Sequence, residues 1–185
     1  TSIKNLTQTI DDFRDFFNPN KERNEFKVLD MVDETLKLIN SQFKNSNIEL
    51  IKSIEDIELF GSQNELQQTL INLLKNAKEE LVNKEKDKKR LIFIDSYIEN
   101  DNVIIKVKDN ADGIPKDIID KVFDSYFTTK EKDGGSGIGL YICKQIVENS
   151  MRGSITVSNV KYEYENETYD GAEFIISIPI DIRDN

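Results

Sequence analysis

A glycine-rich stretch that leads into a helix, residues 133–147 with the sequence DGGSGIGLYICKQIV, constrains this chain more than any other feature. Glycines alternate at Gly135, Gly137 and Gly139, and isoleucines then recur every four residues from Ile138 to Ile146, which predicts an amphipathic helix. Glycines allow close backbone approach, and free N–H groups at a helix start favour an anion. The stretch therefore predicts a phosphate cradle. The alternative is a flexible loop ahead of a core helix, because glycine patterns alone are weak signals.

The bulk composition limits the class of protein. The chain has 185 residues, of which 37% are hydrophobic and 32% charged, and this fits one globular domain. Its formal net charge of −10 argues against nucleic acid or anionic lipid as the main partner, since both require a basic surface. No apolar run approaches the length of a membrane span, and the first residues do not resemble a signal peptide.

The content of cysteine and histidine adds two constraints. A single cysteine, Cys143, excludes an internal disulfide and fits a reducing compartment, so we expect a cytoplasmic location. The sequence leaves open whether a parent protein is anchored in a membrane. We expect Cys143 to be a small core residue on the helix after the glycines. The chain has no histidine, which removes the commonest metal ligand and general base.

The N-terminal segment carries apolar residues at alternating spacings of three and four. They are Ile3, Leu6, Ile10, Phe13 and Phe17. This spacing is typical of a coiled-coil seam, and Asn18-Pro19-Asn20 ends it. The segment is predicted either to pack as a short helix on its own domain or to be the end of a longer helix.

The rest of the chain predicts a mixed sheet with helices on one face, an α/β sandwich. Predicted helices cover residues 30–43, 62–83, 116–122 and the stretch after the glycines. Predicted strands cover 48–54, 58–60, 91–97, 103–108, 154–158 and 172–178, with a hairpin turn at 100–102. A long loop rich in tyrosine and glutamate is predicted between the last two strands.

The predicted helix 62–83 has two contrasting sides. It opens with a capping box, Ser62 followed three residues later by Glu65, and a leucine stripe forms its apolar side. Nearly opposite that stripe lie Glu65, Asn72, Asn76 and Glu79. Asparagine costs roughly half a kcal/mol or more against alanine inside a helix, and its amide oxygen suits Mg²⁺. The two asparagines therefore favour a ligand role, with a solvated face as the alternative.

Asp109 follows the predicted strand 103–108, at the point where the strand leads into a turn. The alternative readings are a turn aspartate that binds its own backbone and a carboxylate that accepts a hydrogen bond from a ligand. The small residues Ala111 and Gly113 follow it, and they would let a flat ring lie against the chain.

Hydroxyl and ammonium groups gather just before the glycines, at Thr128, Thr129, Lys130 and Lys132. Lysine is a mobile point charge suited to phosphate. The alternative for each residue is an ordinary exposed loop.

Taken together in this order, the motifs resemble those of the catalytic ATP-binding domain of sensor histidine kinases, in the GHKL ATPase superfamily. The resemblance covers nearly everything from Phe26 to Pro179. It implies the mixed, mostly antiparallel sheet of that superfamily's ATP-binding fold. The matching segments are NLLKNA at 72–77, DNADGIP at 109–115, FDSYFTTK at 123–130, GSGIGL at 135–140 and, more weakly, GAEF at 171–174.

The resemblance implies roles for individual residues. Asn76 would coordinate Mg²⁺ and act with Asn72 in catalysis, and Asp109 would accept from the adenine amino group. The implied nucleotide-binding residues are Asn72, Asn76, Glu79, Asp109, Ala111, Gly113, Ile114, Thr129, Lys130, Gly135, Ser136, Gly137, Ile138, Gly139 and Leu140. The family usually has glycine in place of Ala111, a small change that we expect to leave binding intact. The segment 128–135 would close over ATP as a lid.

The resemblance also implies a function: transfer of the ATP γ-phosphate to a histidine, for relay to a response regulator. Residues 1–18 would be the end of a helical dimerisation domain of a homodimer, and residues 19–185 the catalytic domain. Without a histidine, this chain would need an acceptor from elsewhere. The alternatives are a nucleotide-sensing or scaffold module and another ATPase or serine kinase of the superfamily. Hydrolases of the superfamily usually have glutamate where this chain has Asn72, which favours a kinase.

Overall fold

The computed structural model describes residues 7, 22–84, 87–129, 137–181 and 183. Apart from Thr7, the predicted N-terminal helix and the domain proposed for residues 1–18 lie outside these residues, as do Lys130, Gly135 and Ser136. Within the described ranges, no helix is both long and apolar enough to cross a membrane.

The centre of the molecule is a five-stranded sheet with the strand order β2–β4–β5–β7–β6. The strands are β2 (Ile48–Ile54), β4 (Arg90–Glu99), β5 (Asn102–Asp109), β6 (Ser154–Tyr164) and β7 (Glu167–Pro179). β2 and β4 pair in parallel, and the other three pairs are antiparallel. Asn100 and Asp101 form the turn between β4 and β5 with φ of 49° and 61°, a conformation that favours such residues. The sheet predicted from the sequence is confirmed.

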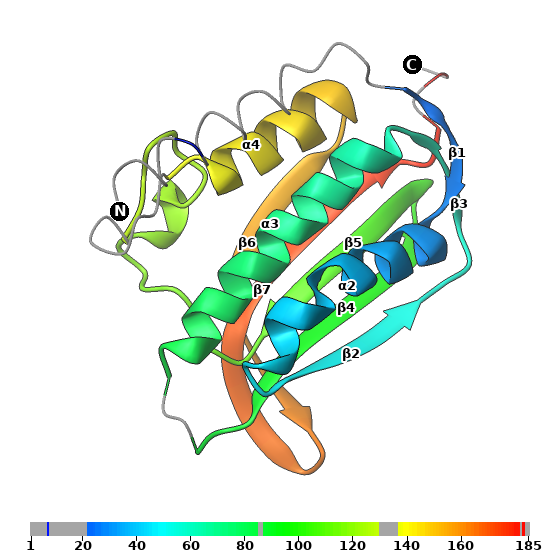
Figure 1. Ribbon diagram of the computed structural model, residues 1–185. Helices are drawn as coiled ribbons and strands as arrows, with labels where there is room; N and C mark the ends of the chain where they lie inside the picture. Colours follow the sequence, from blue (N-terminus) through cyan, green and yellow to red (C-terminus); the bar gives the residue numbers. More distant parts are fainter. Residues whose placement is uncertain (1–6, 8–21, 85–86, 130–136, 182, 184–185) are drawn as a thin grey trace.

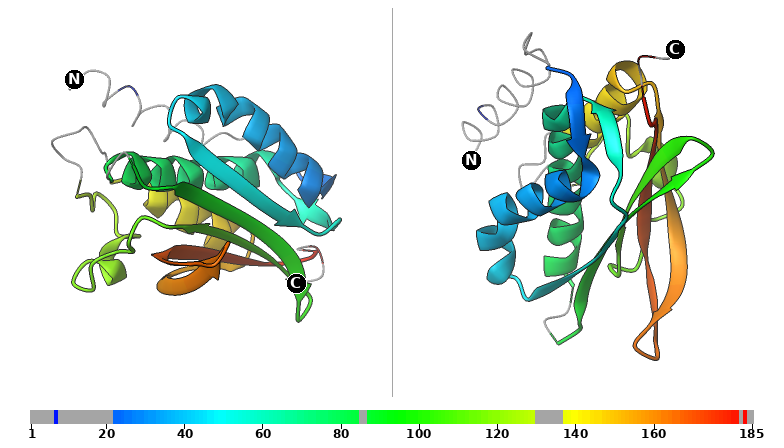
Figure 2. Two further views of the ribbon diagram at one scale, coloured as in Figure 1. Left: turned by 90° about the horizontal axis from the view of Figure 1, so that it is seen from below. Right: turned by 90° about the vertical axis from the view of Figure 1, so that its right-hand side faces the viewer.

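Three helices pack on one face of this sheet (Figure 1), and Figure 2 shows that none of these three lies on the opposite face. They are α2 (Val28–Lys44), α3 (Gln63–Val82) and α4 (Gly139–Gln145), which continues into a π-helical turn, η3 (Ile146–Ser150). The Ser62 hydroxyl caps α3 by accepting from the Glu65 N–H at 3.3 Å. The predicted apolar stripe of α3 lies in the core, at Leu66, Leu70, Leu73, Leu74, Ala77 and Leu81. Cys143 is fully buried there, as expected.

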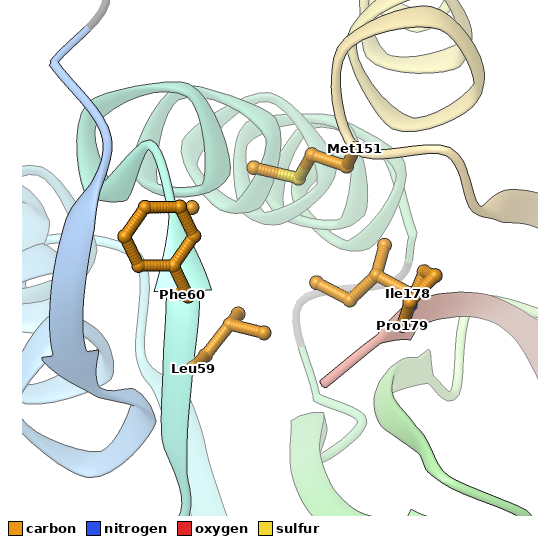
Figure 3. A pocket seen from close by; sticks show the side chains of 6 residues that line it. Leu59, Phe60, Met151, Ile178 and Pro179 are labelled. Carbon is orange, nitrogen blue, oxygen red and sulfur yellow. The ribbon is translucent and has the colours of Figure 1, made fainter. Parts of the chain in front are cut away.

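A second, two-stranded sheet closes one end of the molecule. It pairs β1 (Asn24–Lys27), which the sequence did not predict, with β3 (Glu58–Gly61). Figure 3 shows the apolar side chains between this sheet and the end of β7, among them Leu59, Met151 and Ile178. The hollow between them has a volume of about 10 Å³, close to the minimum for one water molecule. It is therefore a packing gap and not a ligand pocket.

Two sequence predictions are wrong in extent. The helix predicted at 116–122 is only the 3₁₀ turn Ile119–Lys121 (η1), which buries no residue and so lacks the packing that would offset helix nucleation. The loop predicted between the last two strands is a continuation of β6 and β7, which pair as far as Tyr164 and Glu167. We call residues 159–172, which continue beyond the last pair of β5 with β7, the arm.

Candidate nucleotide-binding site

The polar side of α3 is partly covered by α4 and η3. Glu65 and Thr69 are 5% and 0% exposed. The Ser150 hydroxyl donates to Glu65 Oε2, and Cys143 Sγ lies 3.7 Å from the Thr69 carbonyl oxygen. α4 and η3, which follow the glycine stretch, thus pack on the N-terminal half of the side of α3 that the sequence predicted to be polar.

Asn72 and Asn76 lie on the second half of this polar face. Both side chains are half-buried. A Cβ built on Gly139, the first residue of α4, would lie 4.0 Å from Asn72 Oδ1, so Asn72 faces the end of the glycine stretch. Neither asparagine side chain has a hydrogen bond within the described part of the chain. Two amides are therefore available to a ligand, while Glu79 is exposed.

Asp109 is a buried carboxylate, 5% exposed, at the end of β5. Its Oδ1 accepts from the Ala111 N–H at 2.9 Å and from the Ala172 N–H at 3.2 Å. Among the described residues, Oδ2 has no hydrogen-bond partner. Burial raises the pKa of Asp109, and the two N–H donors oppose this shift. Two backbone hydrogen bonds therefore hold Oδ1 in place, and Oδ2 remains able to accept a hydrogen bond from a ligand.

The C-terminal end of α3 meets the segment that follows Asp109. Glu80 and Lys84 both act on the pKa of Asp109, the first raising it and the second lowering it. Lys84 Nζ also lies 3.1 Å from Asp112 Oδ2. Asn72, Asn76 and Glu80 lie about one helical turn apart along α3 and together span about 12 Å. One helix therefore connects the glycine stretch to Asp109.

The turn after Asp109 has a left-handed backbone, with φ of 68° at Asp112 and 80° at Gly113. A Cβ on Gly113 would lie 2.7 Å from Asn159 Oδ1, so the position has no room for a side chain. Asn159 binds the next residue twice: its Oδ1 accepts from the Ile114 N–H and its Nδ2 donates to the Ile114 carbonyl, both at 2.7 Å. Ala111 is 4% exposed and Ile114 is half-buried.

Gly137 is held by Tyr126 and Phe127, which belong to the phenylalanine-rich motif. Its φ is 67°, and a Cβ there would lie 2.5 Å from the Tyr126 carbonyl carbon. The Tyr126 N–H donates to the Gly137 carbonyl at 3.0 Å. The close approach that the sequence predicted at this glycine is therefore made by the chain itself. Any contact that Gly137 makes with a phosphate would be additional.

The other sequence-predicted residues near the glycines differ in exposure. Ile138 is 2% exposed, so only its backbone can meet a ligand, and Leu140 packs partly against the core. Thr129 is exposed. Lys130, Gly135 and Ser136 lie outside the described residues.

Several residues that contact the segment 109–114 were not among the predicted site residues. Three of them make the contact with their side chains: Lys84, Asn159 and Tyr162, whose hydroxyl donates to the Asp109 carbonyl at 2.7 Å. The one available signal was the alternation of tyrosine with charged residues from Tyr162 to Tyr164, which favours a strand over a loop. That signal predicts the strand but not its contacts.

Comparisons with known proteins give the family. The family described as "Histidine kinase-, DNA gyrase B-, and HSP90-like ATPase" matches residues 61–182. The chain belongs to this family. It is 29% identical to Sporulation kinase E of Bacillus subtilis over 183 residues, which are 97% of this chain and 23% of the kinase. The chain thus spans about a quarter of the length of that relative.

Solved structures show the same fold. The catalytic domain of histidine kinase ThkA, in a nucleotide-free form, has a TM-score of 0.72 and 28% identity, covering 89% of this chain and 99% of that domain. A complex of ThkA with the response regulator protein TrrA matches with a TM-score of 0.69 and 24% identity, covering 96% of this chain and 49% of the kinase chain. The chain therefore has the fold of a histidine kinase catalytic domain, and its family is one of nucleotide-binding domains.

The buried charge of Asp109 makes stability depend on pH. Because burial raises the pKa of Asp109 above its ordinary value of 3.8, the folded protein takes up this proton before the unfolded chain does as the pH falls. We therefore expect Asp109→Asn to increase the free energy of unfolding at about pH 7, and the increase to disappear once the pH falls below about 3.8.

Urea unfolding of wild type and Asp109→Asn, from about pH 7 to below about 3.8, measures the difference in their free energies of unfolding. Asp112→Asn, which changes an exposed carboxylate three residues along, is the control and should give no pH-dependent gain of this kind. An Asp109→Asn protein that is less stable than wild type at neutral pH would contradict the prediction.

Proposed function

We propose that this chain is the ATP-binding kinase domain of a sensor histidine kinase. The observation that supports this most directly is that the molecule has both a buried carboxylate at the end of β5 and two amide side chains on α3. Asp109 has one oxygen held by backbone N–H groups, and Asn72 and Asn76 are unpaired within the described residues. This set offers an acceptor for a base at one end. At the other end it offers amide oxygens for Mg²⁺ and amide N–H groups that can donate to phosphate oxygens.

Adenine would lie against the segment 109–114. Asp109 Oδ2 would accept from its exocyclic amino group, because Oδ1 is already occupied by two backbone donors. Ala111 and Gly113 supply small residues beside it, where a flat ring could lie. Thr129, Lys130 and the amides of Gly135 to Gly139 would steady the phosphates, as the family resemblance implies.

Mg²⁺ fits the residues present. It takes hard oxygen ligands and is usually held by one or two protein groups together with substrate phosphates. The half-buried amide of Asn76 is such a group, and it has no partner among the described residues. When bound there, the ion would neutralise phosphate charge. Asn72, one turn earlier, would orient the γ-phosphate.

The acceptor would be a histidine on a separate dimerisation domain, since this chain has none. A bond forms between an imidazole nitrogen and the γ-phosphorus as the bond to the bridging oxygen breaks. ADP leaves with the bonding electrons, and the imidazole proton passes to solvent. The phosphoryl group would then pass to a response regulator, as the complex of ThkA with TrrA suggests for that kinase. We place this reaction in the cytoplasm, where ATP is available.

A second candidate function is nucleotide sensing without transfer. Intact binding residues are compatible with nucleotide sensing. They are also compatible with another enzyme of the family. The presence of Asn72, where hydrolases of the superfamily usually have glutamate, favours the kinase.

Asp109→Asn tests the adenine contact. A hydrogen bond to a charged group contributes roughly 1.5–3 kcal/mol, so we expect ADP affinity to fall about ten- to a hundredfold. Calorimetric titration measures the dissociation constant. Asp112→Asn, which loses only the surface ion pair with Lys84, should change it less than about threefold. Unchanged affinity in the Asp109 variant would remove Asp109 from the site.

Asn76→Ala tests the metal contact. We expect the variant to lose the part of ATP affinity that depends on Mg²⁺ while binding adenosine as wild type does, because the base contacts remain. Titrations with and without Mg²⁺ separate the two contributions. Asn64→Ala, at an exposed asparagine in the first turn of the same helix, is the matched control. Equal loss of adenosine and Mg²⁺–ATP binding would indicate a folding defect instead.

Transfer is tested by adding a histidine-bearing dimerisation domain of a sporulation kinase to this chain with labelled ATP. We expect acid-labile phosphate on the added domain, and none when its histidine is replaced. Nucleotide binding without transfer to any such domain, or to one fused to this chain, would favour the sensing function.

A further inference from the structure

The arm of the β6–β7 hairpin bends across the helix-free face of the sheet. Phe93 lies on that face, because its neighbours Ile92 and Ile94 both point into the core beneath the helices. Its ring packs edge-on against Tyr162 and Tyr164 of the arm, with centroids 5.5 and 5.0 Å apart. Phe93 is on β4, and two strands separate β4 from β6 in the sheet. The arm therefore leans across β5 to reach it.

Further contacts fix the arm in this position. Lys108 Nζ of β5 lies between two rings, 4.8 Å from the centroid of Phe93 and 4.0 Å from that of Tyr162. Near the turn of the arm, Lys89 Nζ lies 2.9 Å from Glu165 Oε2. The β6 side of the arm is therefore held against β4 and β5 at Tyr162 and Tyr164.

The arm also holds the backbone of segment 109–114, whose first residue, Asp109, still pairs with Ile92 of β4 and whose later residues lie beyond the end of β5. At the start of the segment, the Tyr162 hydroxyl donates to the Asp109 carbonyl at 2.7 Å. In the middle, the Asp112 N–H donates to the Asp170 carbonyl at 3.0 Å. At the end, Asn159 binds both polar backbone groups of Ile114 at 2.7 Å.

Tyr162 is suited to this role by its surroundings. Burial, and secondly the negative charge of Asp109, raise the pKa of the Tyr162 hydroxyl, so it stays protonated and donates. The arm and Asp109 are also in direct backbone contact. A Cβ on Gly171 would lie only 1.8 Å from the Asp109 carbonyl oxygen, so a side chain there would displace Asp109.

We propose that Tyr162 and Asn159 are positioning residues for adenine: the arm fixes both ends of segment 109–114 and thereby sets the selectivity for a purine that bears an amino group. The inference rests on the proposed function, in which Asp109 Oδ2 accepts from that amino group. Neither residue touches the base. Each acts by fixing the backbone from which the base is recognised.

Tyr162→Phe tests the inference with a matched control on the same strand. The variant removes one hydroxyl and keeps the ring that packs on Phe93 and Lys108. Tyr164→Phe also removes a hydroxyl from a ring on Phe93, but that hydroxyl faces Glu49, 3.4 Å away, and not Asp109. The probes are ADP and inosine diphosphate, which differ in having an amino group or an oxygen at the same ring position.

We expect Tyr162→Phe to weaken ADP binding about three- to tenfold, the range of one hydrogen bond. Binding of inosine diphosphate, measured by competition, should change much less. The selectivity ratio, which is the affinity for ADP divided by that for inosine diphosphate, therefore falls. Tyr164→Phe should leave the ratio unchanged. A merely structural role for Tyr162 would lower thermal stability and leave the ratio intact, and that result would overturn the inference.

Asn159→Leu provides a second, independent variant, because leucine keeps the branching at Cγ and loses both hydrogen bonds to Ile114. It should lower the ratio in the same direction, and an unchanged ratio would remove Asn159 from the inference. The proposed function is tested separately by wild type and Asp109→Asn. If wild type shows no preference for ADP, or if Asp109→Asn retains it, both the function and the inference fail. If the preference needs Asp109 but survives Tyr162→Phe, the inference alone fails.

Discussion

The packing of α3 between two different surfaces is the constraint on which the rest of this structure depends. Its leucine stripe lies on the sheet, where each buried leucine contributes about 1.5–3 kcal/mol. Its polar side is covered at one end by α4 and left accessible at the other, where Asn72 and Asn76 lie. Turning α3 by half a turn about its own axis would bury the amides and expose the leucines. The apolar stripe therefore fixes where the polar groups point.

A buried carboxylate adds a cost that the fold must offset. Asp109 is almost inaccessible, and a charge in that position is unfavourable unless it is hydrogen-bonded. Two backbone N–H groups from separate elements, those of Ala111 and Ala172, supply the compensation. Because one donor comes from the strand β7, the carboxylate is held by the sheet and not only by its own turn. A group whose ionised form lowers stability is more readily explained by binding than by folding.

Much of this could be read from the sequence because it follows from local pattern. The leucines of α3 recur at helical spacing, and the glycine and asparagine motifs are short and contiguous. The arm was not predicted, because its many glutamates favoured a loop over the alternation that Tyr162 and Tyr164 begin. Its contacts could not have been predicted at all. Asn159 meets Ile114 across 45 residues of chain, and no local pattern specifies such a pairing.

The position of β7 in the sheet has a consequence for how the chain reaches this state. β7 is the last strand in the sequence, yet it lies between β5 and β6, in the interior of the sheet. Until β7 is made, β5 has an open edge, and an unpaired edge is a template for aggregation. Closing that edge joins segments far apart in the chain, which is slow. A growing chain on the ribosome would therefore have to stay soluble with an incomplete sheet, and the donor from Ala172 to Asp109 would form among its last contacts.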